Sequence, residues 1–197
     1  MEYTFAALSK HLGQVNEEEL LSPLANLSDA DAKTLIEELT RQRPGLENQS
    51  LGILGYLRPK LHRLIDIWTG GDYVDIREGQ ENNTLDEETR QRISDFFQDW
   101  DFLPLPDRDF IHYSKDDSWN NLEVGEIIEL TSFMGCAPHD WPHHSNGPAR
   151  LLFRPSTQAR YLGALTREQK EREVLIQPRS QFIVEAFHKG LVRLRDA

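Results

Sequence analysis

Apolar residues recur at helical spacing along the first half of the chain. The segment LSDADAKTLIEELTRQ begins with a Ser/Asp cap, and its apolar residues three and four positions apart predict an amphipathic helix. GILGYLRPKLHRLIDIW carries a second apolar stripe, and Pro59 predicts a kink or break because proline cannot continue the helical hydrogen bonds. A third helix is predicted over TLDEETRQRISDFFQDW, with Thr84 as its cap and Glu87 completing a capping box. The predicted buried positions are Ala32, Leu35, Ile36 and Leu39; Ile53, Leu54, Leu57, Leu61, Leu64, Ile65 and Trp68; and Ile93, Phe96, Phe97 and Trp100.

The pattern changes at the proline-containing connector LPLPDRD. The apolar runs that follow are short and bounded by Gly, Pro, Asn or Ser, which is typical of antiparallel strands rather than of βαβ units. Strands are predicted in DFIHYS, VGEIIELTSFM, ARLLFRP, ARYLGALT, REVLIQP, SQFIVEAF and LVRLRD. The chain is therefore predicted to be an α+β protein, with a helical lobe over 1–103 and a β-rich lobe over 104–197.

Composition and charge exclude several classes of protein. The 197 residues contain no apolar run of the ~18 residues that a membrane span needs. The net charge of −11 argues against non-specific nucleic-acid binding, although residues 150–197 hold 10 Lys/Arg against 5 Asp/Glu. A single cysteine, Cys136, excludes an internal disulfide or a thiolate zinc site. The N-terminal residues do not resemble a cleaved secretory signal, so we expect a protein that acts in a reducing cytosol.

Two glutamates precede an apolar run in EREVLIQP. In a strand, alternation places Glu171 and Glu173 on one face, about 7 Å apart, while Val174 and Ile176 face the core. One carboxylate of such a pair can bind a sugar hydroxyl while the other accepts a proton from a nucleophile. The alternative is an ordinary solvated strand face.

Three segments together resemble the arginine–serine–glutamate group of mono-ADP-ribosyltransferases, which includes actin-modifying toxins and many injected bacterial effectors. IDIWTGGDYVDIREG resembles the pattern of the family's helical lobe. VGEIIELTSFMGCA is similar to the strand that runs from a glycine to Phe-x-Ser-Thr-Ser, with Gly125 and Phe133 at the family's separation. ARLLFRPSTQARYLGALTREQKEREVLIQPRSQFIV resembles the closing strands with their Glu-x-Glu. The resemblance covers about residues 60–187 and implies an NAD-binding core of two packed, mainly antiparallel sheets over 104–197.

The resemblance also implies roles for individual residues. Glu173 matches the glutamate that binds the nicotinamide-ribose 2′-hydroxyl and stabilises an oxocarbenium-like transition state. Glu171 matches the residue that activates the acceptor. Thr166–Arg172 would form the loop that recognises the target, and Gly135–Trp141 the loop over the nicotinamide.

The sequence departs from the family at two positions. His112 stands where the family has an arginine that contacts the NAD phosphates, and Gly135-Cys136-Ala137 replaces Ser-Thr-Ser. A histidine holds the ribose and carboxamide in the diphtheria-like branch, so His112 is still expected to bind NAD. Arg150, Arg154 or Arg160 could compensate at the phosphates. The residues expected to contact NAD are His112, Tyr113, Gly135, Phe133, Trp141 and Tyr73.

The implied activity is transfer of ADP-ribose from NAD, its substrate, to a side chain of a target protein. The family's targets include actin, small GTPases and ubiquitin, and the chain is expected to be a bacterial effector without a cleavable signal, delivered to the host cytosol, or otherwise cytoplasmic. No metal is expected, because His139, Asp140, His143 and His144 lie in one loop without a standard zinc spacing. Two alternatives stay open: an NAD glycohydrolase on the same fold, and a catalytically inactive protein-binding module.

Overall fold

The chain consists of two compact units. The computed structural model describes residues 3–14, 16–41, 49–138, 149–167 and 172–197. The first unit comprises residues 1–104 together with 162–172, and the second comprises 105–161 and 173–197. The chain thus passes from one unit to the other after residues 104, 161 and 172. The α+β class is confirmed, while residues 162–172, which the sequence analysis assigned to the β-rich lobe, group with the helices.

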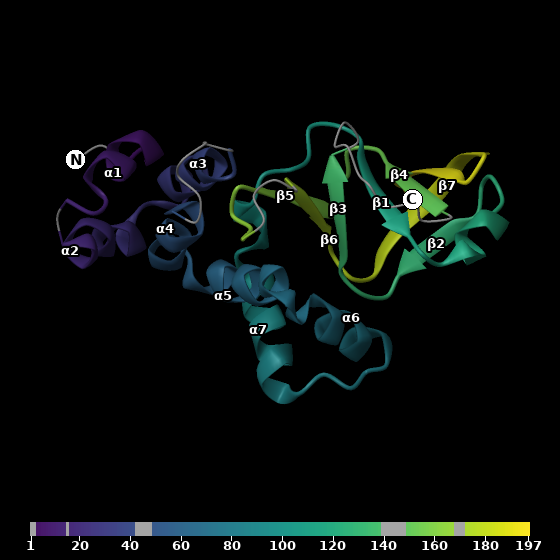
Figure 1. Cartoon of the computed structure of the whole chain (residues 1–197), viewed down its shortest axis with the longest axis horizontal. Helices are drawn as coiled ribbons and strands as arrows, with labels where there is room; N and C mark the ends of the chain where they lie inside the picture. Colours follow the sequence, from purple (N-terminus) through teal and green to yellow (C-terminus); the bar gives the residue numbers. More distant parts are fainter. Residues whose placement is uncertain (1–2, 15, 42–48, 139–148, 168–171) are drawn as a thin grey trace. The chain divides into compact units, whose positions relative to one another are not determined.

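The helical unit confirms the apolar stripes read from the sequence. All predicted buried positions in the three segments are buried except Phe97, which is half-buried. Its helices, labelled in Figure 1, are α1 (Phe5–His11), α2 (Glu17–Leu21), α3 (Asp29–Leu39), α4 (Gln49–Leu57), α5 (Pro59–Ile67), α6 (Tyr73–Glu81) and α7 (Glu87–Gln98). Short 3₁₀ turns lie at Ser22–Asn26 and Trp100–Phe102, and a π-turn lies at Trp68–Asp72. No helix in the described part of the chain has the length and apolar character needed to cross a bilayer.

Local signals set most of the helix boundaries. Ser28 caps α3 as predicted, with its hydroxyl accepting the N–H of Asp31. Pro59 divides the long second stripe into α4 and α5. The predicted cap of α7 is wrong: Asp86, not Thr84, accepts the N–H of Thr89, at 2.7 Å.

The β unit carries its strands in an order that differs from the order along the chain. The strands are β1 (Phe110–Ser114), β2 (Ile127–Leu130), β3 (Met134–Pro138), β4 (Ala149–Phe153), β5 (Ala159–Gly163), β6 (Glu173–Ile176), β7 (Ser180–His188) and β8 (Leu191–Asp196). They are hydrogen-bonded in the order β2-β7-β8-β4-β1-β3-β6-β5, and β4–β8 is a parallel pair. The single strand predicted in VGEIIELTSFM is wrong, because the chain breaks at residues 131–133 and sends β2 and β3 to different neighbours.

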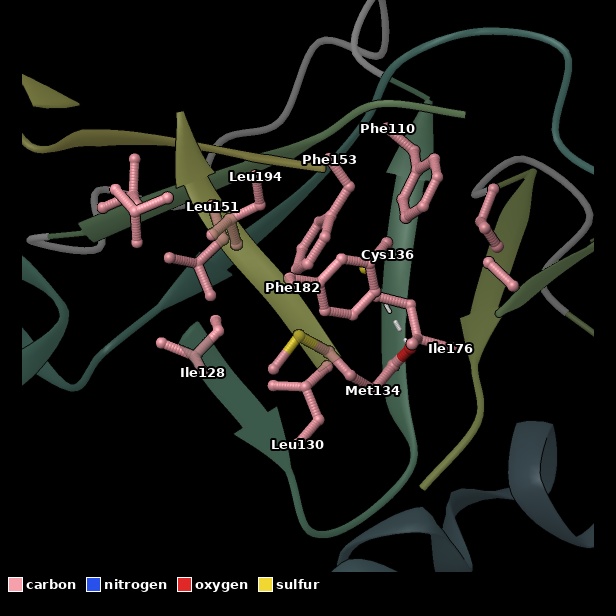
Figure 2. Close-up of a cluster of buried hydrophobic side chains, with 14 residues drawn as sticks. Phe110, Ile128, Leu130, Met134, Cys136, Leu151, Phe153, Ile176, Phe182 and Leu194 are labelled. Atoms are coloured by element: carbon pink, nitrogen blue, oxygen red, sulfur yellow. Dashed lines mark hydrogen bonds between the residues drawn. The ribbon is translucent and has the colours of Figure 1, made fainter. Parts of the chain in front are cut away.

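All eight strands contribute side chains to one hydrophobic cluster. The cluster includes Ile128 from the edge strand β2 and Ile176 from β6, although five strands separate these two in the hydrogen-bonded order. The sheet must therefore bend over on itself. Figure 2 shows Phe153 and Phe182 between those two residues, and their rings meet edge to face at 4.9 Å. Two separate packed sheets are not confirmed; one continuous, mainly antiparallel sheet encloses the core.

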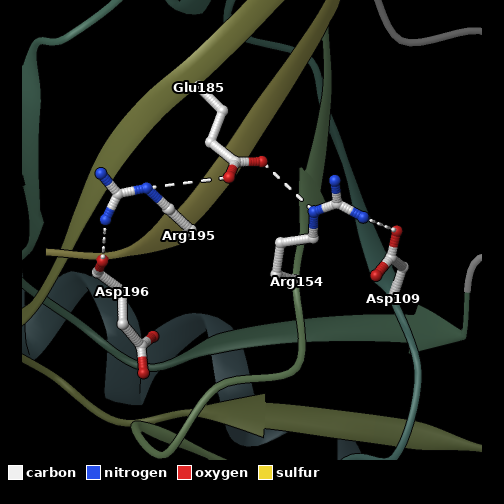
Figure 3. A network of polar contacts seen from close by, with 5 residues as sticks. All are labelled: Asp109, Arg154, Glu185, Arg195 and Asp196. Carbon is white, nitrogen blue, oxygen red and sulfur yellow. Dashed lines mark hydrogen bonds and ion pairs between the residues drawn. The ribbon is translucent and has the colours of Figure 1, made fainter.

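A polar network covers part of the outer side of this unit. Glu185 of β7 lies between Arg154 and Arg195, with O···N distances of 3.2 and 3.7 Å, and Arg154 also approaches Asp109 (Figure 3). Next to it, Asp196 accepts the backbone N–H of Thr157 at 3.1 Å. These contacts connect β8 at the C-terminus to β7 and to the loop after β4.

Candidate functional site

Glu173 is the first residue of β6 and is half-buried. Val174 and Ile176 point into the β core, as the alternation predicted, and Leu175 is buried on the opposite face. Glu173 shares the face of Leu175 because side chains two apart in a strand point the same way. β6 pairs with β3 through Val174 and Cys136. The carboxylate therefore projects from the non-core face of β6, which lies between β3 and the edge strand β5, at the residue where β6 begins.

The second glutamate of the predicted pair, Glu171, lies outside the described residues. Arg172, between the two, has a φ of 49°, in the left-handed region rather than the extended one. The strand ladder begins only at Glu173. The 7 Å separation of the two carboxylates, which was inferred from strand alternation, therefore stays a prediction.

His112 and Gly135 are in direct contact. The Nδ1 of His112, on β1, lies 2.8 Å from the backbone oxygen of Gly135, on β3. A carbonyl oxygen only accepts, so Nδ1 carries the proton and donates it. The backbones of β1 and β3 pair at Phe110 and Ile111. The imidazole of His112 then makes the next contact between the two strands. Gly135 pairs in turn with Leu175 of β6. Three adjacent strands thus carry His112, Gly135 and Glu173.

The loop predicted over Gly135–Trp141 is wrong at its start. Residues 134–138 form strand β3, because their backbone pairs with β1 on one side and with β6 on the other. Cys136 is buried in the β core. Trp141 lies outside the described residues, as do the histidines of the HDWPHH segment. In the described residues, no group of three or more His, Cys, Asp or Glu could hold a metal ion.

The other expected cofactor contacts lie in different surroundings. Phe133 is fully buried, whereas Tyr113 is half-buried on β1, opposite Arg150 of β4. Tyr73 belongs to the helical unit, is 45% exposed, and its ring centroid lies 5.9 Å from that of the buried Trp68. The π-turn between those two aromatic residues contains Gly71 with a φ of 113°, which favours glycine.

The three arginines considered for the NAD phosphates all have partners within the chain. Arg154 pairs with Glu185 and Asp109. Arg160 is buried and donates to the backbone oxygens of Thr157 and Ala159. Arg150 donates to the backbone oxygen of Lys189 at 3.3 Å. A phosphate contact by Arg154 would compete with two ion pairs, a condition that the sequence did not reveal.

Comparison with solved structures places this arrangement of strands in a known fold. Exoenzyme S from Pseudomonas aeruginosa, solved with human 14-3-3 protein beta and carba-NAD, is 14% identical with a TM-score of 0.58, over 92% of this chain and 90% of that one. The C3 exoenzyme of Clostridium limosum is 10% identical with a TM-score of 0.58, over 85% and 93%. The ADP-ribosyltransferase Vis, solved with an inhibitor, is 16% identical with a TM-score of 0.56, over 89% of each chain. No family model and no curated protein sequence matches the chain.

The chain has the fold of the bacterial mono-ADP-ribosyltransferases. Each likeness covers most of both chains, so both the helical and the β-rich regions belong to the matched fold. The resemblance inferred from three short segments is confirmed at the level of the fold. At identities of 10–16% these likenesses assign no residue roles.

Proposed function

We propose that this chain is an NAD-dependent mono-ADP-ribosyltransferase in which Glu173 is the catalytic carboxylate. The observation that carries the proposal is the position of Glu173: half-buried, at the start of β6, on the non-core face, in a chain with the ADP-ribosyltransferase fold. A half-buried carboxylate is screened less by water than an exposed one, so it stabilises positive charge more strongly.

The reaction replaces one bond to the ribose with another. The bond from C1′ of the nicotinamide ribose to the ring nitrogen breaks, nicotinamide leaves with the electron pair, and a nucleophile of the target bonds to C1′. Glu173 accepts a hydrogen bond from the ribose 2′-hydroxyl and stabilises the positive charge that develops on the sugar. Glu171 takes the proton that the nucleophile loses.

His112 is proposed to hold the NAD. Its hydrogen bond to Gly135 fixes both the orientation of the ring and the position of one ring proton. His112 lies on β1 and Glu173 on β6, and only β3 separates these two strands in the hydrogen-bonded order, which supports the proposal. We further propose that the target is a host protein and that the chain is a delivered bacterial effector.

The test compares wild type with Glu173→Gln in the transfer of label from radiolabelled NAD to the proteins of a host-cell lysate. This variant keeps the shape of the side chain but loses its charge, and we expect transfer to fall by at least about 100-fold, the effect of removing one transition-state contact. Glu185→Gln is the matched control, since Glu185 is also a half-buried strand glutamate. The control breaks two ion pairs, so it is at least as disruptive to stability, yet it should label normally. Wild-type transfer by Glu173→Gln would remove the catalytic assignment.

The same assay separates the two alternatives. An NAD glycohydrolase uses water as the acceptor, so it would release nicotinamide without labelling any protein. An inactive binding module would do neither, and calorimetry would show millimolar or weaker affinity for NAD.

A further inference from the structure

Strand β2 is one end of the hydrogen-bonded order, so among the described strands it pairs only with β7 (Figure 1). The backbone oxygen of Glu126 accepts the N–H of Val184, and that of Leu130 accepts from the last residue before β7. The backbone groups of alternate residues in an antiparallel strand point to opposite sides. The N–H and C=O groups of Ile127 and Glu129 therefore point away from β7, along an open edge of the described sheet.

This edge carries the most exposed large apolar side chains of the described residues. Val124 is 65% exposed and Ile127 is 59% exposed. Ile127 pairs with the half-buried Ile183 of β7, so the two side chains lie next to each other on the non-core face of the sheet. On the opposite face, Ile128 belongs to the hydrophobic cluster. A strand added at this edge would therefore cover apolar surface on both faces.

The same edge is acidic, because Glu123, Glu126 and Glu129 are all exposed. The carboxylate of Glu126 accepts the backbone N–H of Glu123 at 3.0 Å. The carboxylate of Glu129 accepts from the side-chain amide of Gln181 at 2.9 Å. Both donors are neutral, so they leave the charges of the carboxylates in place. Against these three carboxylates, Arg179 brings one exposed cation to the end of β2.

These charges decide between two occupants of the edge. If β2 paired with β2 of a second copy, the acidic segments 123–129 of both copies would lie side by side, and like charges on neighbouring strands are destabilising. Short, charged edge strands protect proteins against such self-pairing. A strand with basic side chains meets opposite charges instead. The exposed backbone groups of the edge can pair with such a strand whatever its sequence.

We propose that β2 is a docking edge for an extended segment of a partner protein, which alternates basic and apolar side chains and adds to the sheet as a further strand. Its basic side chains lie on the side of Glu129 and its apolar side chains lie against Ile128, because alternate residues of a strand face opposite sides. This docking is independent of the proposed transfer of ADP-ribose, since it uses no group of the candidate catalytic site.

The experiment titrates the isotope-labelled chain with the end-blocked peptide KVKVKVK and follows the amide signals by NMR. We expect a Kd of roughly 0.1 mM, because a few edge hydrogen bonds and exposed ion pairs each contribute little. The amide protons of Ile127 and Glu129 should become protected against exchange with solvent, while that of Ile128, which points to β7, should not change. The acidic peptide EVEVEVE should not bind at about 1 mM, because its charges repel those of the edge.

Three substitutions separate backbone pairing from charge. Ile127→Pro removes an edge-facing N–H, which edge strands tolerate, and should weaken binding of KVKVKVK at least about fivefold. Ile127→Ala keeps that N–H and should bind the peptide more tightly than Ile127→Pro does. Glu129→Lys should weaken binding about tenfold and admit EVEVEVE. Glu37→Lys, at an exposed position of α3, changes the net charge equally and is the control, so it should bind as wild type does.

Each outcome supports or overturns the docking edge. Absence of KVKVKVK binding at about 1 mM overturns it outright, and equal binding of the two peptides, or of KVKVKVK to wild type and Glu129→Lys, overturns the basic occupant. Protection that misses Ile127 and Glu129 overturns strand addition, and this result needs no substitution, so it stands even if Ile127→Pro unfolds. A wild-type dimer in sedimentation that Ile127→Pro dissociates would replace the partner protein by a second copy.

Discussion

Substitution of Gly79 by alanine tests the packing around α6, the helix that follows the π-turn. Gly79 is a buried position in the interior of this helix. An added Cβ would lie 2.4 Å from Cδ2 and 3.0 Å from Cγ of Leu85, which is half-buried in the connection to α7. Both distances are shorter than a carbon–carbon contact of about 3.5 Å, so Leu85 must move by about 1 Å.

Two effects of opposite sign determine the result. Replacing a helical glycine by alanine stabilises a helix by about 1 kcal/mol, because less backbone entropy is lost on folding. Forcing a methyl group into an occupied site costs about 1–3 kcal/mol, and about 2 kcal/mol is expected where the obstacle is the end of a flexible side chain. We therefore expect Gly79→Ala to lower the free energy of unfolding by about 1 kcal/mol, which lowers the melting temperature by about 2–4 °C in a chain of this size.

Urea unfolding followed by circular dichroism measures the change, and Gly52→Ala is the matched control. Gly52 lies in α4, is exposed, and has no atom within 4 Å of an added Cβ, so alanine there should stabilise by up to about 1 kcal/mol. With Leu85→Ala in the background, Gly79→Ala should also become stabilising, which gives a coupling energy of about 2 kcal/mol. If Gly79→Ala stabilises the otherwise unchanged protein as Gly52→Ala does, the steric argument is wrong.

Two further predictions concern the candidate site and the cap of α7. His112→Ala removes the hydrogen bond to Gly135, so it should raise the KM for NAD and lower the free energy of unfolding by about 1 kcal/mol. An unchanged KM in steady-state kinetics would show that His112 does not contact NAD. The backbone N–H and the hydroxyl of Thr89 lower the pKa of Asp86 below its ordinary value of 3.8. The charged cap therefore stabilises the fold fully at pH values above 3.8. This stabilisation is lost as the pH falls through the lowered pKa of the folded state. Asp86→Asn, which keeps the capping oxygen without the charge, should therefore melt below wild type at neutral pH and approach it in acid; a difference that persists in acid would contradict the charge argument.

The sequence alone determined the features that depend on neighbours close in the chain. The apolar stripe of α3 and its Ser28 cap follow from helical periodicity within a few residues. Pro59 ended α4 because it lacks the N–H that the helix needs. The burial of Val174 and Ile176 followed from strand alternation in the same way. These signals are local, so no tertiary contact had to be known.

At two places the local sequence pattern did not fix where an element begins or ends: the start of α7 and the break between β2 and β3. Thr84 and Asp86 are both good helix caps, and the structure uses Asp86 because the chain is still completing the end of α6 at Thr84, whose N–H donates to Gly79. The run from Val124 to Met134 is apolar enough for one strand, but β2 pairs with β7 and β3 with β6. Strand partners come from distant parts of the chain, so the break between β2 and β3 could not be located from the run itself.

Only the tertiary structure brought the candidate site residues together. His112 and Gly135 are 23 residues apart, so their contact leaves no periodic signal in the sequence. The sequence could supply the residue types and, through the order of three segments, the fold. Which side chains meet depends on how the sheet bends and where residues 162–167 pack, and those are set by burial of apolar area over the whole chain rather than by any local pattern.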